Sequence, residues 1–148
     1  MRAVVTRVKS ASVTIEGQIH GAIDAGLLVL LGIKTEDEAE QAVKLADKIC
    51  GLRVFQDDQG QMNLSLGDVG GKLLVISQFT LYGNCKKGRR PEFLSAARPE
   101  TAIPLYERFI LECKSRGFQV ETGQFGASMQ VASVNDGPVT LILDTETL

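Results

Sequence analysis

The sequence predicts one α+β domain, residues 1–148, in which mixed and antiparallel β-sheets form a barrel-like core beside two main helices. Short segments of alternating, β-branched residues recur along the chain and predict many strands. Two stretches follow helical spacing. Only one strand–helix–strand crossover is evident, near the start, which favours α+β over a doubly wound sheet. A length of 148 residues with 44% hydrophobic content fits a single domain with a core of its own.

The first third of the chain predicts three strands. Arg2–Val8 and Ser12–Glu16 are short, alternating and rich in β-branched residues. Gly17-Gln18, between two isoleucines, predicts a hairpin turn after the second of them. Gly26–Ile33 is a continuous apolar run, which predicts a strand buried on both faces.

Two helices are predicted from periodicity and end signals. Thr35-x-x-Glu38 is a capping box, and the apolar residues after it follow helical spacing as far as Gly51, a plausible residue just past the helix end. A second helix is predicted over Thr101–Arg116. Pro104 is tolerable there only in the first turn, where its missing N–H costs no hydrogen bond.

Further strands are predicted between and after these helices. Leu52–Phe55 and Met62–Leu66 are short, and Lys72–Leu81 contains a buried apolar core. Gln119–Leu143 predicts more strands, interrupted by the turn-forming residues Asn135–Pro138.

Composition and charge exclude several classes of function. The first residues lack the charged, apolar and small-residue regions of a secretion signal, and no apolar run approaches the ~20 residues of a spanning helix, so we expect a cytoplasmic protein without a membrane partner. The three cysteines are scattered and His20 is the one histidine, so neither a metal site nor a cofactor is expected. The net charge of −2 requires any nucleic acid to be held by a local patch.

Three polar segments stand out from this framework. Ser77–Leu81 follows a buried strand, Lys86–Arg90 holds four cations in five positions, and Asn135–Thr140 contains Asn-Asp-Gly-Pro. Each also has a structural interpretation: a strand running into solvent, a solvated loop and a hairpin connection. Neither a G-x-S-x-G elbow nor a P-loop is present, and a Ser-His-Asp triad would have to use His20, which fits a hairpin strand better.

In this order, the segments resemble the D-aminoacyl-tRNA deacylase family. Ser77-Gln78-Phe79-Thr80-Leu81 matches the S-Q-F-T-L motif of that family, and Asn135-Asp136-Gly137-Pro138-Val139-Thr140 matches N-x-G-P-V-T. Similar stretches also occur at Arg7-Val8, at Lys87–Pro91 and at Gly126–Met129, so the resemblance spans essentially the whole chain.

The resemblance implies an enzyme that hydrolyses the ester between a D-amino acid and the acceptor end of a tRNA, and that rejects L-amino acids. It implies a homodimer with its active sites at the subunit interface. The Gly137-Pro138 pair, joined by a cis bond, would check chirality in the partner's pocket. The implied catalytic segment is Ser77, Gln78, Phe79 and Thr80, the implied pocket lining is Phe125 and Met129, and the implied tRNA contacts are Lys86, Lys87, Arg89 and Arg90.

Two questions of mechanism stay open at the level of the sequence. Thr80 could attack the ester, although a hydroxyl nucleophile needs a base. Alternatively, the 2′-hydroxyl of the terminal adenosine assists, while backbone N–H groups near Phe79 stabilise the oxyanion, which better fits a chain without a triad. Because glycine has no side chain to exclude, glycyl-tRNA should also be cleaved. A catalytically inactive tRNA-binding module and a relative with changed chirality are the alternative functions.

Overall fold

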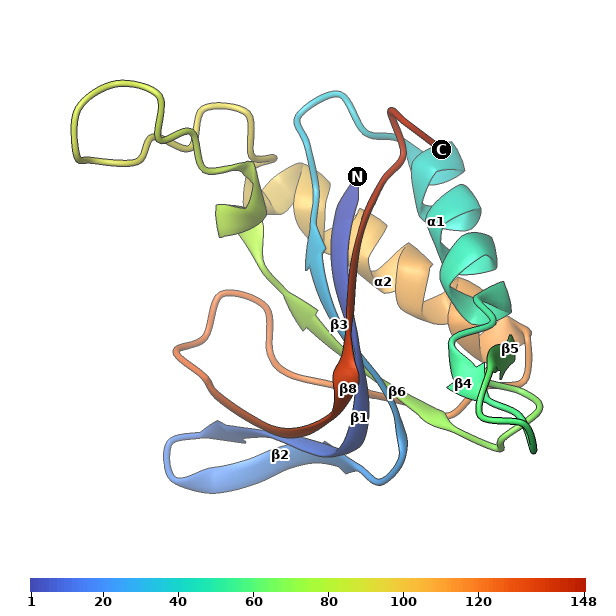
Figure 1. Ribbon diagram of the computed structural model, residues 1–148. Coiled ribbons are helices and arrows are strands. Elements are labelled where there is room, and N and C mark those ends of the chain that lie inside the picture. The colour runs from blue at the N-terminus through green and yellow to red at the C-terminus, as the bar shows by residue number, and fades with distance from the viewer.

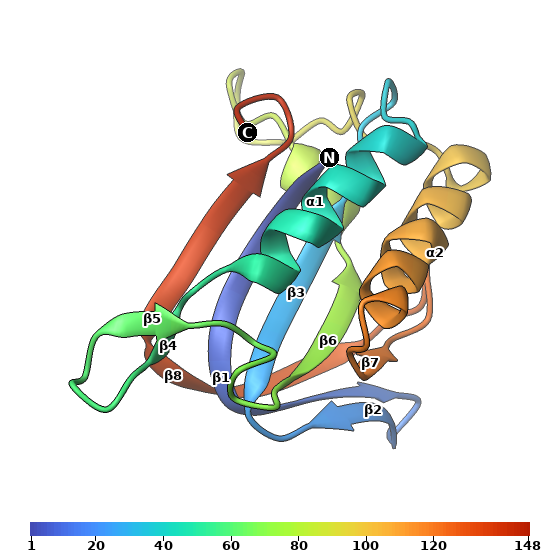
Figure 2. The same ribbon diagram turned by 90° about the vertical axis from the view of Figure 1, so that its right-hand side faces the viewer.

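A long, bent strand, β1, organises the structure, a computed structural model that describes residues 1–148 (Figures 1 and 2). β1 runs from Arg2 to Ile15. Its first half pairs antiparallel with β3 (Gly26–Gly32) and its second half with β2 (Gln18–Ile23). The other edge of β1 pairs antiparallel with β8 (Gln130–Asp144) along almost its whole length. One strand therefore links three partners, and its bend lets the sheet curl.

The middle of the sheet is parallel. β6 (Lys72–Ser77) pairs parallel with β3 on one side and with β7 (Val120–Thr122) on the other. Two helices make the crossovers, α1 (Ala39–Gly51) before β6 and α2 (Pro99–Ser115) before β7. The remaining elements are short: the hairpin of β4 (Phe55–Gln56) with β5 (Met62–Leu64) and the 3₁₀ turn η1 (Phe79–Tyr82).

The sheet separates two apolar cores. Both helices cover one face, where Phe109, Leu45 and Ile49 are fully buried (Figure 2). The smaller core lies inside the curl and comprises Val8, Ala11, Val13, Ile23, Leu28, Leu74 and Ile76. Burial of these side chains on both faces is the main favourable term for the fold. Neither helix is long and apolar enough to cross a membrane.

The outer strands β2 and β7 meet and nearly close the barrel. His20 Nδ1 lies 2.8 Å from the carbonyl oxygen of Thr122. A Cβ on Gly21 would lie 2.9 Å from the same oxygen, so this close approach requires glycine. The predicted barrel-like α+β fold with two main helices in one domain is confirmed, and His20 makes a contact across the barrel closure.

Several predicted boundaries were wrong. Arg2–Val8 and Ser12–Glu16 are one strand, because β8 pairs across the point where the partner changes from β3 to β2. The hairpin turn is Glu16-Gly17, where both residues have positive φ, rather than Gly17-Gln18. Leu52–Phe55 forms a strand only from Phe55 onward, since β5 offers it few pairing residues.

The helix ends also differ from prediction. The capping box of α1 is formed by Glu38 and Gln41 rather than by Thr35 and Glu38, with the Glu38 N–H donating to Gln41 Oε1 at 2.7 Å. α2 starts at Pro99, which suits a first helical position because proline has no N–H to leave unpaired. Pro104 therefore lies beyond the first turn, inside the helix.

Candidate active site

A pocket of about 260 Å³ opens where the parallel strands β3 and β6 end. Parallel strands bring their carboxyl ends to one edge of a sheet, a common place for ligand sites. Ser77, Gln78 and Phe79 lie on one wall of the pocket. Ten of its 13 lining residues are hydrophobic, so the ligand-facing surface is mostly apolar with a few polar groups, as small-molecule sites usually are.

The Ser77–Thr80 segment is held by main-chain bonds as β6 leaves the core. The Gln78 N–H donates to the Leu31 carbonyl at 2.8 Å, which extends the ladder of β3 and β6 by one residue. The chain then turns into η1, and the Leu81 N–H donates back to the Gln78 carbonyl at 3.2 Å. The N–H groups of Phe79 and Thr80 begin this 3₁₀ turn, where no intrahelical acceptor exists for them.

Thr80 has no titratable neighbour within hydrogen-bonding distance. Its hydroxyl accepts a hydrogen bond from the Gln78 side-chain amide, and both side chains are accessible to solvent. His20 lies across the barrel closure and does not line the pocket. The pocket therefore offers main-chain donors, a hydroxyl and an amide, but no side chain placed to act as a base on Thr80.

Phe125 and Met129 also line the pocket. The Phe125 ring packs edge-on against Tyr106 of α2, with 6.0 Å between ring centroids. The Tyr106 hydroxyl donates to the Val75 carbonyl at 2.8 Å, and burial raises the pKa of this tyrosine to about 12. Met129 packs against Gly123, where a Cβ would lie 2.4 Å from the methionine sulfur. These contacts fix the apolar wall.

The sequence predicted a turn between two strands at Gly137 and Pro138. In the structure these residues lie instead in a bulge of the single strand β8. Thr6 pairs with Thr140 and Val8 with Asn135, so four residues of β8 oppose the single Arg7. The Gly137–Pro138 peptide is cis, as the family resemblance implied. A Cβ on Gly137 would lie 2.1 Å from the Val139 nitrogen, so only glycine fits.

Arg7 of β1 binds the bulge through Asp136. Its side chain is buried, its Nε donates to the Asp136 carbonyl at 2.9 Å and lies 3.5 Å from Asp136 Oδ2, and its Nη1 donates to the Val54 carbonyl. A buried guanidinium needs such partners to offset its lost hydration. The Gly137–Pro138 pair itself remains exposed.

The bulge and the pocket of the same chain lie apart. Arg7, opposite the bulge, is aligned with Leu27 of β3, which is aligned with Leu73 of β6. Ser77 lies four residues further along β6 and three strands across from β8. At ~3.3 Å per residue and ~4.8 Å per strand, the separation exceeds ~13 Å. Gly137 and Pro138 do not line the pocket of their own chain.

The four predicted cations lie on an exposed loop next to the pocket. An antiparallel bridge between Asn84 and Glu92 closes the loop, with N–H to carbonyl distances of 2.8 and 3.0 Å. Phe93, at its end, packs edge-on against Phe79, with 5.2 Å between ring centroids. The loop extends from the body of the protein (Figure 1), and all of Lys86, Lys87, Arg89 and Arg90 are exposed.

Sequence reasoning missed eight of the 13 residues that line the pocket. Leu31 and Ile33 could have been found only by predicting that β3 and β6 pair in parallel, because this pairing brings the end of β3 beside Ser77. No sequence signal marked the small side chain at the start of α2, and the family-like stretch Gly126–Met129 was noted without placing Gly126 and Ala127 in the pocket. The pocket residues missed were Leu31, Ile33, Ile76, Ala97, Ala102, Gly126, Ala127 and Val131.

These features define a class of protein: a small α+β domain with an apolar pocket at the ends of parallel strands, where main-chain N–H groups, a hydroxyl and an amide lie beside the pocket. The family model described as D-Tyr-tRNA(Tyr) deacylase matches residues 4–144. This chain therefore belongs to that family.

The curated relatives agree with this assignment, and a solved structure has a similar fold. A D-aminoacyl-tRNA deacylase of Thermus aquaticus is 59% identical over 98% of this chain and 95% of its own length. One from Exiguobacterium sibiricum is 60% identical over 97% and 99%. A structure titled "c-Myc DNA Unwinding Element Binding Protein" is 40% identical, with a TM-score of 0.92 over 98% of this chain and 99% of that one.

A more distant structure shows the fold alone. It is titled as a probable eukaryotic D-amino acid tRNA deacylase and is 16% identical to this chain. Its TM-score is 0.85 over 96% of this chain and 97% of that one.

Proposed function

We propose that this chain is a hydrolase that cleaves the ester bond of D-aminoacyl-tRNAs and releases the D-amino acid and free tRNA. The observation that carries the proposal is the intact Ser77–Leu81 motif, whose first three residues line the pocket, in a chain 53–60% identical to named deacylases. The apolar walls suit amino-acid side chains of different kinds. A cytoplasmic location, where charged tRNA is used, fits this substrate.

For the chemical step, we favour assistance by the RNA over attack by Thr80. A threonine hydroxyl becomes a nucleophile when a base removes its proton. Here its neighbour is the Gln78 amide, which donates rather than accepts. The N–H groups of Phe79 and Thr80 can instead stabilise the oxyanion, while the terminal 2′-hydroxyl of the tRNA assists the attacking water. A Thr80→Ala variant that retains most activity supports this account, and a loss of many orders of magnitude with the fold intact contradicts it.

We infer that the complete site needs two chains, with Gly137–Pro138 of one reaching the pocket of the other. The bulge lies more than ~13 Å from the pocket of its own chain. β8 is also an outer strand with exposed apolar side chains, including Ile142 at 75% and Val134 at 56% exposure. Exposed apolar surface on a strand with one unpaired edge favours association with a second copy.

Selection between mirror images would follow from this geometry. D- and L-amino acids carry the same side chain, so apolar transfer cannot separate them. A stiff main-chain bend can hold the α-amino group through its carbonyls and occupy the space that an L side chain needs. Hydrolysis rates of D-tyrosyl-, L-tyrosyl- and glycyl-tRNA test this. We expect cleavage of the D-tyrosyl and glycyl esters only, and equal rates for the two tyrosyl esters would end the exclusion model.

A mixed-dimer experiment tests the shared site. Gly137→Ala damages the bend, because its Cβ would lie 2.1 Å from the Val139 nitrogen, and Ala127→Phe fills the pocket. Each variant alone should be inactive. After random re-association, half of the dimers carry one of each chain and one undamaged site, so activity should return to about a quarter of wild type. No recovery in verified mixed dimers would show that each chain supplies its own bend.

A second candidate is a nucleic-acid-binding module without catalysis. The observation that favours it is the 40% identical structure titled as a DNA unwinding element binding protein. The basic loop would serve either function, since Lys and Arg bind phosphates without reading sequence. The deacylation assay separates the two candidates: binding of D-tyrosyl-tRNA without ester cleavage would establish the module.

A further inference from the structure

We propose that Arg2 is a positioning residue for the deacylase reaction, because it fixes the 3₁₀ turn η1 that carries Phe79 and Thr80. Its Nη1 donates to the Leu81 carbonyl at 2.7 Å. Its guanidinium also lies over the Tyr82 ring, 4.6 Å from the centroid. Arg2 does not line the pocket, so its influence on the reaction passes through the turn. The inference rests on the proposed function.

The turn η1 depends on outside contacts for its position. It spans only four residues, and a single 3₁₀ turn has little stability of its own. Its start is tied to β3 by the bond from the Gln78 N–H to the Leu31 carbonyl. Phe79 is 54% exposed and Thr80 is exposed, so these two residues have no anchor in the core, and within the turn only Tyr82, at its end, is buried. The contacts at that end therefore decide where the turn lies.

Arg2 and Gly32 together hold that other end. The two residues are paired in the ladder of β1 and β3. A Cβ on Gly32 would lie 3.0 Å from Leu81 Cβ and 3.3 Å from Tyr82 Cδ2, so the turn lies directly on the end of β3. Arg2, on the neighbouring strand, contacts the same two residues: it binds the Leu81 carbonyl and lies over the face of the Tyr82 ring.

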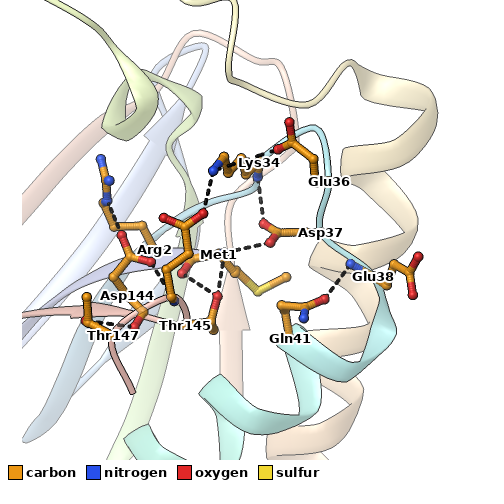
Figure 3. A network of polar contacts seen from close by, with 11 residues as sticks. Met1, Arg2, Lys34, Glu36, Asp37, Glu38, Gln41, Asp144, Thr145 and Thr147 are labelled. Carbon is orange, nitrogen blue, oxygen red and sulfur yellow. Dashed lines mark hydrogen bonds and ion pairs between the residues drawn. The ribbon is translucent and has the colours of Figure 1, made fainter.

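Asp144 fixes the guanidinium itself, as Figure 3 shows. Arg2 Nε donates to Asp144 Oδ2 at 3.0 Å, and Asp144 Oδ1 accepts from the Glu146 N–H at 3.0 Å. The strand that carries Arg2 is also fixed at Met1, whose nitrogen donates to Asp37 Oδ1 and Thr145 Oγ1, both at 2.8 Å. A planar, forked guanidinium can bind carboxylate, carbonyl and ring at once, whereas an ammonium cannot.

Loss of this contact should slow the chemical step more than it weakens binding. Without Arg2, the Leu81 carbonyl loses its donor, and the end of the turn is held only by the burial of Tyr82 and the packing on Gly32. The N–H groups of Phe79 and Thr80 then leave the geometry that an oxyanion requires, and a displacement of ~1 Å can cost ~100-fold in rate. The apolar walls and the basic loop keep their own contacts.

The test compares Arg2→Ala and Arg2→Lys with Arg108→Ala, a control that removes another arginine–carboxylate pair, 2.8 Å to Glu112, on α2 and away from the turn. Single-turnover cleavage of D-tyrosyl-tRNA gives the maximal rate and the half-saturating enzyme concentration. We expect Arg2→Ala to lower the rate by ~10- to 100-fold with half-saturation within ~3-fold, and Arg2→Lys to recover little of it. Arg108→Ala should keep its rate within about twofold of wild type, as expected for an exposed pair.

Amide hydrogen exchange distinguishes positioning from general stability. In both Arg2 variants the Leu81 and Gly83 amides should exchange faster, while those of β3 stay protected. Any of three results would overturn the positioning role. Arg2→Ala could cleave at the wild-type rate, it could lose rate while the amides of β3 lose protection equally, or it could raise the half-saturating enzyme concentration at an unchanged rate. Inactivity of the wild-type protein itself would instead refute the proposed function, so the two failures are distinct.

Discussion

The basic loop should carry most of the salt dependence of tRNA binding. Lys86, Lys87, Arg89 and Arg90 are exposed, and the ion pairs of the chain all involve other residues. Their charges are therefore free to neutralise phosphates. The bridge between Asn84 and Glu92 keeps them together beside the pocket.

The expected magnitude follows from the number of cations. Each neutralised phosphate of a duplex contributes ~0.9 to the slope of log affinity against log salt concentration, so four give a slope of about −3.6. From ~50 to ~200 mM salt, the affinity should then fall about 150-fold. A variant with both Lys86→Ala and Lys87→Ala should show a slope of about −1.8 and a fall of only about 12-fold.

Fluorescence anisotropy of labelled tRNA over a salt series measures this slope. The matched control carries Lys48→Ala and Lys114→Ala, which remove two exposed lysines from the last turns of α1 and α2. Its slope should equal that of the wild type. A wild-type slope near zero, or an unchanged slope in the loop variant, would refute phosphate contact by this loop.

Three further predictions concern the fold around the site. Tyr82→Phe should raise the free energy of unfolding by about 1 kcal/mol, because the buried Tyr82 hydroxyl has no hydrogen-bond partner, and a lower melting temperature would contradict this. Gly32→Ala should destabilise by ~1–3 kcal/mol in denaturant titrations, since its Cβ would lie 3.0 Å from Leu81 Cβ. Gly51→Ala, whose Cβ meets nothing within 4 Å, is the control and should not destabilise. Burial raises the pKa of Tyr106 to about 12 in the folded state, above its value in the unfolded chain. The free energy of unfolding therefore keeps its full value below pH ~10, where this hydroxyl is protonated in both states, and falls by up to ~3 kcal/mol as the pH rises through ~12. Tyr106→Phe should flatten this part of the curve of stability against pH, and an unchanged curve would refute the assignment.

Patterns of neighbouring residues predicted which segments form strands and helices better than they predicted the residues at which these begin and end. The continuous apolar runs at Gly26–Ile33 and Leu73–Ile76 correctly indicated buried strands, because helices and an inner core cover them. The end of β6 was less predictable. η1 forms where the polar residues after Ser77 leave the sheet, and it lies against Gly32, a residue distant in sequence.

The Asn-Asp-Gly-Pro segment shows why local signals can mislead. These residues are typical of a turn between strands. In the structure the strand continues on both sides, because β1 pairs with β8 before and after the bulge and Arg7 binds the Asp136 carbonyl. Tertiary pairing decided against the turn, and the same pairing exposes Gly137 and Pro138.

The sequence by itself determined the α+β class, the two helices and the motif residues Ser77–Leu81 and Asn135–Thr140, because periodicity and residue type act over a few neighbours. Only the tertiary structure decided that Leu31, Ile33 and Ala102 share a pocket with Ser77, and that the Gly137–Pro138 bulge lies away from it. It also brought Arg2 to the carbonyl of Leu81, 79 positions along the chain. Contacts between residues so distant in sequence depend on strand register and sheet curvature, which are set by packing across the whole chain.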